Sequence, residues 1–230
     1  MSNAVFISKL TSLALPVVLG EDQYLEARAE TLGREPVDLI LRAKAGAASG
    51  PTSFLMDKKP GDTFLITGEL TLVNDKESPD RGTPVVRVFT ISKATEDQYA
   101  NEVNIVGRVV QETKNAEKSS SRSVAVNRYL GKAPNGQSIV DTDWFRVRGY
   151  GKNGERLASF TKGTLVEIDG MLEKKQNKAG KPYCEVKIRR VRSHKAGKGG
   201  EVNPAADKEA AGYESSAFDG KDEPDFPTNW

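Results

Sequence analysis

The 230-residue chain is poor in the side chains on which most enzymes depend. It has one cysteine, Cys184, and one histidine, His194. A single cysteine excludes a disulfide framework, and the two residues together cannot supply a four-ligand zinc site. A catalytic triad would have to rely on His194 alone. These absences argue against an enzyme, and we expect neither a cofactor nor a metal ion.

Long hydrophobic runs are also missing. No stretch approaches the roughly 18 to 20 consecutive apolar residues of a membrane-spanning helix. The N-terminal stretch from Ala4 to Leu19 contains Lys9 and lacks both the basic segment and the small-residue cleavage site of a signal peptide. The sequence therefore predicts a cytoplasmic protein without a membrane partner.

Charge is distributed unevenly along the chain. Residues 1–98 carry 11 basic and 14 acidic side chains, a net charge of −3, whereas residues 99–200 carry 21 and 10, a net charge of +11. Residues 201–230 return to −6, with 2 basic and 8 acidic side chains. A basic segment between two acidic ones favours a polyanionic partner, because clustered Lys and Arg release counterions from a phosphate backbone. An unevenly charged but purely solvated surface is the alternative.

The sequence repeats itself at a spacing close to one hundred residues. Three short patterns recur in the same order, and this predicts two copies of one domain. We place the copies at residues 1–97 and 98–194, followed by a disordered acidic tail at 195–230, which is rich in Gly, Pro and acidic residues. The repeated patterns are Asn3-x-Val5-x-Ile7 with Asn101-x-Val103-x-Ile105, Gly61 and Gly68-x-Leu70 with Gly163 and Gly170-x-Leu172, and Gly82-x-Pro84 with Gly180-x-Pro182.

Alternating apolar and polar residues predict that the second copy is built from β-strands. One short stretch with helical character, Asn153 to Ser159, lies between the third and fourth strands. Five strands with a single helix in this place are typical of an OB-fold barrel, so we predict an all-β protein with two tandem five-stranded barrels. A five-stranded SH3-like barrel or a sandwich fragment is the alternative. The five strands contain Val103, Ile105 and Val109; Val124 and Val126; Phe145 and Val147; Val166, Ile168 and Leu172; and Cys184, Val186 and Ile188.

The third of these strands carries a stripe of aromatic and basic side chains. Side chains alternate across a strand, so Phe145 and Val147 face the barrel interior. Trp144, Arg146, Arg148 and Tyr150 then share the opposite face, which predicts base stacking on the rings and phosphate contacts at the arginines. Packing of Trp144 under a loop or at a subunit contact is the alternative.

Three segments of the second copy resemble the bacterial single-stranded DNA-binding protein family. They run from Asn101 to Arg108, from Asp143 to Lys152 and from Lys162 to Leu172. The resemblance implies an OB-fold that coats single-stranded DNA without sequence preference and performs no chemistry. It also implies stacking roles for the aromatic residues at positions 144 and 150 and a basic role for position 146.

Further binding residues are expected around this stripe. The hairpin after Leu172 lacks the stacking tryptophan that the family usually places there, so it offers charge only. Tyr129 is the candidate aromatic residue on the hairpin after the second strand, with a packing role as the alternative. The remaining candidates are Lys152, Arg122, Arg128, Lys174, Lys175, Lys178, Lys181 and Arg189.

The first copy differs from the second at the stripe. Its aligned segment, Val37 to Ala43, has neither aromatic residue. We expect a degenerate barrel used for dimerisation or for organising the DNA path. A weaker second site through Arg28, Arg42 and Lys44 is the alternative. Because the family generally assembles four OB-folds, two per chain imply a homodimer.

The C-terminal tail resembles the acidic, aromatic-ended tail with which this family binds other proteins. An apolar ring and a terminal carboxylate can enter a pocket flanked by basic residues. The resemblance therefore implies recruitment of replication, repair and recombination proteins and a nucleoid-associated location. A merely solubilising tail is the alternative. The residues concerned are Asp222, Glu223, Asp225, Phe226, Pro227 and Trp230, and the ending Pro-Thr-Asn-Trp departs from the family's usual acidic-Pro-Phe.

Two other functions remain open at this stage. An RNA-binding or replication-restart OB-fold module is the nearer one, because stacking and phosphate contacts do not read the ribose 2′-hydroxyl. A nuclease using Asp141 and Asp143 with Mg²⁺ is the more distant one, since turns before strands commonly contain aspartates and no further carboxylate cluster accompanies this pair.

Overall fold

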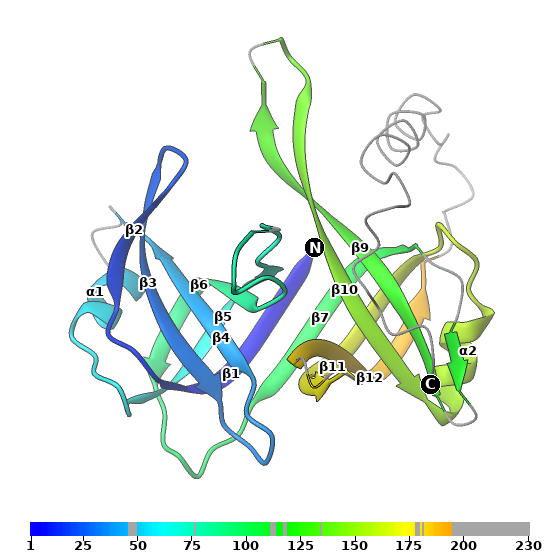
Figure 1. Ribbon diagram of the computed structural model, residues 1–230, viewed down its shortest axis with the longest axis horizontal. Helices are drawn as coiled ribbons and strands as arrows, with labels where there is room; N and C mark the ends of the chain where they lie inside the picture. Colours follow the sequence, from blue (N-terminus) through cyan, green and yellow to red (C-terminus); the bar gives the residue numbers. More distant parts are fainter. Residues whose placement is uncertain are drawn as a thin grey trace. The chain divides into compact units, whose positions relative to one another are not determined.

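In the part of the chain that the structure describes, ten of twelve strands close two barrels, which two short helices accompany (Figure 1). The computed structural model describes residues 1–45, 50–75, 77–110, 114–116, 119–133, 135–177, 180 and 182–194. The first barrel contains β1 (Ser2–Leu10), β2 (Leu15–Leu19), β3 (Asp22–Thr31), β4 (Asp38–Lys44), α1 (Pro51–Met56), β5 (Thr63–Leu72) and β6 (Pro84–Lys93). The second contains β7 (Asn101–Val109), β8 (Lys114–Ala116), β9 (Ser119–Lys132), β10 (Ser138–Tyr150), α2 (Gly151–Ser159), β11 (Leu165–Gln176) and β12 (Pro182–Ser193).

Each barrel closes through the same sequence of strand pairs. In the first, β1 pairs with β3, β3 with β4, β4 with β6, β6 with β5, and β5 returns to β1. In the second, β7, β9, β10, β12 and β11 form the equivalent ring. Only β4–β6 and β10–β12 are parallel within these two rings of described strands. The predicted all-β architecture of two tandem OB-fold barrels is confirmed.

The alternating sequence pattern explains which side chains fill the barrels. Phe145 and Val147 on β10 are buried, as are Val124 and Val126 on β9. The first barrel buries Phe6, Leu41 and Phe64 in the same way, so the two interiors form a continuous apolar cluster. Burying such side chains contributes about 1.5–3 kcal/mol each, which makes this pattern the main source of stability.

Helix α2 lies unusually close to β10 because two glycines meet there. A Cβ on Gly149 would be 2.8 Å from backbone atoms of Asn153, and one on Gly154 would be 2.7 Å from the Gly149 carbonyl oxygen. Any larger side chain would push the helix away from the strand. The helix, predicted from Asn153, begins at Gly151 and buries Leu157 against the barrel end.

The two barrels are joined through a shared sheet. Strands β1 and β7 pair antiparallel, with Ala4 opposite Val103. These two residues occupy equivalent places, since Ala4 also faces Gly68 on β5 and Val103 faces Gly170 on β11. The pairing is therefore centred on a local pseudo-twofold axis. Met1–Ser193 form one compact unit.

Some sequence-based expectations concern residues outside this description. Lys178, Lys181 and the tail residues Asp222, Glu223, Asp225, Phe226, Pro227 and Trp230 lie outside the described residues. Within the described part of the chain, no helix is long and apolar enough to cross a membrane.

Candidate nucleic-acid interface

Strand β10 presents two aromatic rings on its outer side. Trp144 is 40% exposed and Tyr150 is 44% exposed, whereas Phe145 and Val147, which alternate with them, are buried. Arg146 and Arg148 lie between the two rings on the same outer side and are half-buried. The structure thus places the four side chains of the predicted stripe together on one face.

Strand β12 adds a third ring beside this stripe. It runs parallel to β10, with Arg148 opposite Lys187. The Arg146 guanidinium lies over the Tyr183 ring at 4.8 Å from its centroid, and the Lys187 ammonium lies 5.7 Å from the Tyr150 ring centroid. Cation–π contacts of this kind hold rings and charges together. Sequence reasoning missed Tyr183 and Lys187, although both alternate with the apolar residues of this strand.

Two carboxylates hold the cations of this face in place. Glu185 is almost fully buried and accepts hydrogen bonds from Nε of Arg148 at 3.0 and 3.1 Å. Glu173 on β11 pairs with Lys175 at 2.7 Å and with Lys187 at 3.0 Å. We call the outward residues of these strands the aromatic face: Trp144, Arg146, Arg148 and Tyr150 on β10, Glu173 and Lys175 on β11, and Tyr183, Glu185 and Lys187 on β12.

Small side chains border the aromatic face on β9. Trp144 stands opposite Ala125, Arg146 opposite Ser123 and Tyr150 opposite Ser119. Short neighbours leave the large rings raised above this side of the strand. Trp144 therefore has a small neighbour on the β9 side.

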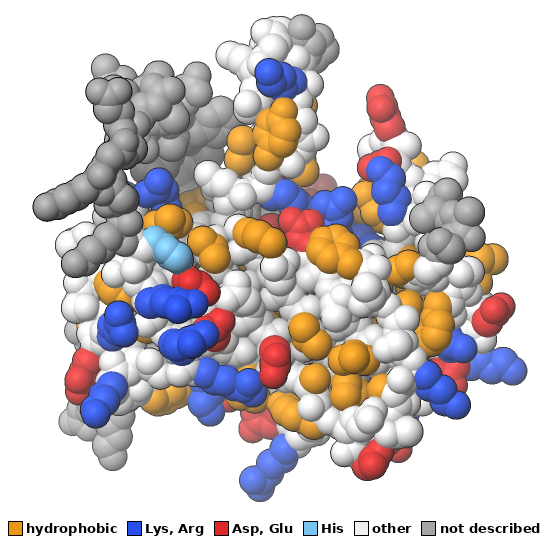
Figure 2. Space-filling model, turned by 180° about the vertical axis from the view of Figure 1, so that it is seen from behind, with side chains coloured by type: hydrophobic (Ala, Val, Ile, Leu, Met, Phe, Trp, Pro, Cys, Tyr) orange, Lys and Arg blue, Asp and Glu red, His pale blue; other side chains and the backbone are white. Residues whose placement is uncertain are grey.

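The projecting β9–β10 hairpin extends the same surface (Figure 1). Tyr129 is 60% exposed and stands opposite Val140, which is also exposed. Leu130 and Ile139 are exposed on this hairpin too, and Figure 2 shows a hydrophobic patch next to a basic side chain on the projection. In the same view, Lys and Arg side chains gather near the single histidine, His194, which follows β12. The exposed position of Tyr129 rules out core packing for this ring.

Two of the expected basic residues are directed elsewhere. Arg122 is 6% exposed and donates a hydrogen bond to the carbonyl of Ala158 in α2, because it shares the inward side of β9 with Val124 and Val126. Arg128 also lies on that side and pairs with Asp141. Neither residue belongs to the aromatic face, which corrects the expectation that both would line it. The alternation of β9 was the available signal for Arg122.

Lys174 also lies away from the aromatic face. It points to the opposite side of β11 from Lys175, and its ammonium lies 2.6 Å from the Asp38 carboxylate of the first barrel. Lys152 is exposed in the first turn of α2, at the end of the face. Arg189 is exposed where β12 bulges and contacts the Met171 sulfur at 3.9 Å. Lys175 alone of the hairpin lysines described joins the aromatic face.

The first barrel has an equivalent face with different chemistry. Strand register places Arg42 and Arg87 where the second barrel has Arg148 and Lys187. By the same register, Asp38 and Lys44 replace the two exposed rings of β10, and the buried Ile40 replaces Arg146.

Each cation of the first face has a carboxylate partner. Arg42 pairs with Glu26 at 2.8 Å, Lys44 with Asp22 at 2.7 Å, and Arg87 with Glu69 at 3.0 Å. Arg28 pairs with Asp80, which the loop after β5 brings back over the face. We call the eight residues of these four pairs the first-barrel face. All three cations of the alternative second nucleic-acid site, Arg28, Arg42 and Lys44, therefore have a carboxylate counterion, and β4 carries no aromatic ring.

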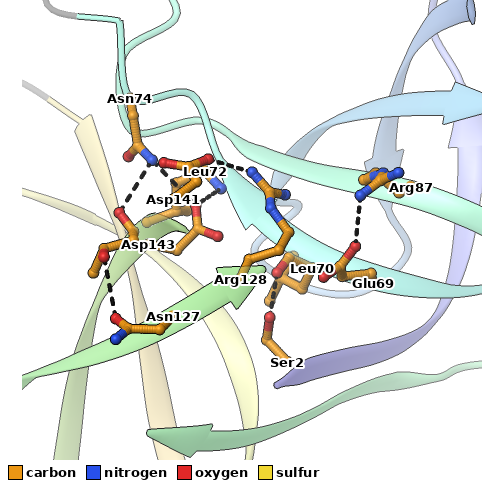
Figure 3. Close-up of polar contacts among 11 residues, drawn as sticks. Ser2, Glu69, Leu70, Leu72, Asn74, Arg87, Asn127, Arg128, Asp141 and Asp143 are labelled. Atoms are coloured by element: carbon orange, nitrogen blue, oxygen red, sulfur yellow. Dashed lines mark hydrogen bonds and ion pairs between the residues drawn. The ribbon is translucent and has the colours of Figure 1, made fainter. Parts of the chain in front are cut away.

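A buried aspartate links the first barrel to the strand that carries the stripe (Figure 3). Asp143 is 1% exposed and accepts hydrogen bonds from the Leu72 backbone N–H at 3.0 Å and from the Asn74 amide at 3.3 Å. Burial raises the pKa of Asp143, although the hydrogen bond from Leu72 opposes this. Asp143 therefore has a structural role, and its neighbour Asp141 is occupied by Arg128.

No group of three or more His, Cys, Asp or Glu side chains suited to a metal ion occurs among the described residues. The surface instead offers stacking rings and cations, which is the chemistry of nucleic-acid binding. A family model described as the single-strand binding protein family matches residues 100–192. Residues 100–192 belong to the single-strand binding protein family. The match spans the second barrel from before β7 to Arg192 in β12, and the family consists of DNA-binding proteins that are not enzymes.

Solved structures extend the likeness to both barrels. The wild-type single-stranded DNA binding protein from Thermus aquaticus has a TM-score of 0.60 and 13% sequence identity, covering 87% of this chain and 96% of that one. A deletion variant of the Thermus aquaticus protein gives a TM-score of 0.59 and 12% identity, covering 85% and 95%. A search of curated proteins finds no match. At these identities the likeness establishes the fold, here for the first and the second barrel together.

Proposed function

We propose that this chain binds and protects single-stranded DNA without sequence specificity, and that it does so through the aromatic face of the second barrel. The family match of residues 100–192 supports single-stranded DNA as the ligand. The observation that carries the location is the placement of Trp144 and Tyr150, exposed on one strand with two arginines between them.

The chemistry of the face fits a ligand of any base sequence. Every base has a π-face, so stacking on Trp144, Tyr150 and Tyr183 does not depend on base identity. Arg146, held over Tyr183, can contact a phosphate without leaving the ring. Tyr129 continues the surface along the hairpin and would stack a further base.

Replacing Trp144 by Ala tests this proposal. We expect affinity for oligo-dT to fall by about 1–3 kcal/mol, the usual contribution of one stacked base. Phe89→Ala is the control, because Phe89 is an aromatic side chain of the first barrel that is 60% exposed, and it should leave affinity unchanged. Normal binding by a folded Trp144→Ala variant would show that DNA does not bind at this face. Equal affinity for oligo-dT and oligo-U would extend the ligand to RNA.

The first barrel would then organise the assembly, and the tail would recruit partners. Two barrels per chain support a homodimer with four barrels, which a mass measurement in solution tests. The acidic residues from Asp222 onward, with Phe226 and Trp230, support binding of replication, repair and recombination proteins at the nucleoid. A pulldown on single-stranded DNA should lose those proteins when Trp230 is replaced by Ala. An unchanged set of captured proteins would leave the tail a solubilising role.

A further inference from the structure

The aromatic face contains more acid than a surface built only to attract phosphate would need. Four cations, Arg146, Arg148, Lys175 and Lys187, share it with Glu173 and Glu185. The two carboxylates cancel half of the positive charge at the place where DNA phosphates would lie. They therefore act against the electrostatic part of binding.

The two carboxylates differ in what they hold. Glu185 is 1% exposed and its partner Arg148 is 19% exposed, so separating them would leave a buried charge without its partner. Glu173 is 13% exposed, but its partners Lys175 and Lys187 are 32% and 44% exposed. Both lysines can therefore turn to solvent, or to a phosphate, without Glu173.

The position of Glu173 gives it two lysines at once. It accepts hydrogen bonds from Lys175 on its own strand and from Lys187 on β12. Lys187 also lies by the Tyr150 ring. Burial would raise the pKa of Glu173, but hydrogen bonds from the two lysines lower it below its ordinary value, so the group is a carboxylate at neutral pH. A phosphate approaching Tyr150 meets lysines that already have a counterion.

We propose that Glu173 is an affinity-setting residue of the aromatic face: a built-in counterion that competes with DNA phosphate for Lys175 and Lys187. This rests on the function proposed above. Its effect is to weaken binding and to reduce the salt dependence of binding, which favours release of the strand. The first barrel has Thr71 at the equivalent place on β5, so a neutral side chain is compatible with this fold.

The test is a salt titration of oligo-dT binding by Glu173→Gln and Glu173→Thr. One more available cation should steepen the plot of log affinity against log salt by about 0.7, the value for one phosphate on a single strand. If the effect vanishes at 1 M salt, this slope corresponds to about a fivefold gain in affinity at 0.1 M salt. Glu26→Gln is the matched control, because it removes the same charge beside Arg42 on the first-barrel face, and it should change neither quantity.

Three results separate the possible failures. Unchanged or weaker binding by both folded Glu173 variants would overturn the inference and leave Glu173 as a residue that only positions lysines. An equal gain in Glu26→Gln would also overturn it, since net charge alone would then explain the effect. Normal binding by Trp144→Ala would instead overturn the proposed location of DNA.

Discussion

The two barrels share one strand order and one register, yet their equivalent faces have opposite character. On the first-barrel face, four cations meet four carboxylates, and no ring takes the place of Trp144. On the aromatic face, two carboxylates accompany four cations, and three aromatic rings lie among them. The backbone alone therefore does not make an OB-fold barrel a nucleic-acid binder.

The difference lies in a few outward positions. Asp38, Ile40 and Lys44 of β4 correspond to Trp144, Arg146 and Tyr150 of β10. The inward residues of the same strands are apolar in both barrels, so the two barrels share their interior pattern and differ on the surface. The first-barrel face has four carboxylates for its four cations, whereas the aromatic face has two carboxylates for four cations, so the aromatic face has the larger net positive charge.

The largest expected contrast concerns stability. Arg148→Met should destabilise the protein by about 3–5 kcal/mol, because it leaves the Glu185 carboxylate buried without its charged partner. Arg42→Met, the equivalent change in the first barrel, should cost only about 0–1 kcal/mol, because Glu26 is 21% exposed and can be hydrated. Urea unfolding of both variants measures the difference. Equal losses of unfolding free energy would contradict the claim that Glu185 is costlier to leave without its partner than Glu26 is.

A smaller effect is expected at the junction between the barrels. Asp143→Ala removes the acceptor for the Leu72 N–H and the Asn74 amide, and we expect a loss of about 1–3 kcal/mol in the free energy of unfolding. Asp143→Asn keeps an oxygen acceptor and is the matched control. It should unfold at a urea concentration close to that of the wild type.

The stability of the wild type and that of Asp143→Asn should depend differently on pH. The pKa of Asp143 is raised in the folded state above 3.8, so its contribution to stability is greatest below pH 3.8 and falls as pH rises through the folded pKa. Asp143→Asn lacks this loss. It should therefore gain stability relative to the wild type as the pH rises from 3.8 through the folded-state pKa of Asp143. A difference between the two proteins that stays constant with pH would contradict the raised pKa.

The smallest expected effect separates two adjacent lysines. Lys175→Ala and Lys187→Ala should each reduce the salt slope of DNA binding by roughly 0.7, the amount for one phosphate contact. Lys174→Ala should leave the slope unchanged, since Lys174 is bound to Asp38 on the far side of the strand. Binding to oligo-dT at several salt concentrations measures the three slopes. A reduced slope for Lys174→Ala would place DNA across both barrels.

Much of this arrangement could be predicted from local patterns. Alternation along β10 correctly placed Phe145 and Val147 inside and Trp144 outside. The same rule, applied to β9 and β12, would have directed Arg122 inward and Tyr183 outward. What alternation cannot provide is the identity of neighbouring strands.

Contacts between distant strands needed the structure. The parallel pairing of β10 with β12 brings Glu185 to Arg148 across 37 residues of sequence. The junction brings Lys174 to Asp38 across 136 residues. These contacts explain why a cluster of lysines and arginines in the sequence does not translate into an equal number of phosphate-binding groups.

Fluorescence of Trp144 tests the central claim most directly. Trp144 and Trp230 are the only tryptophans in the sequence, so a Trp230→Phe variant reports on the aromatic face alone. Titration of this variant with oligo-dT should quench the emission in parallel with binding followed by a gel mobility shift, because bases stack on the ring. Emission that stays constant while the mobility shift shows bound DNA would contradict the account and place the strand elsewhere.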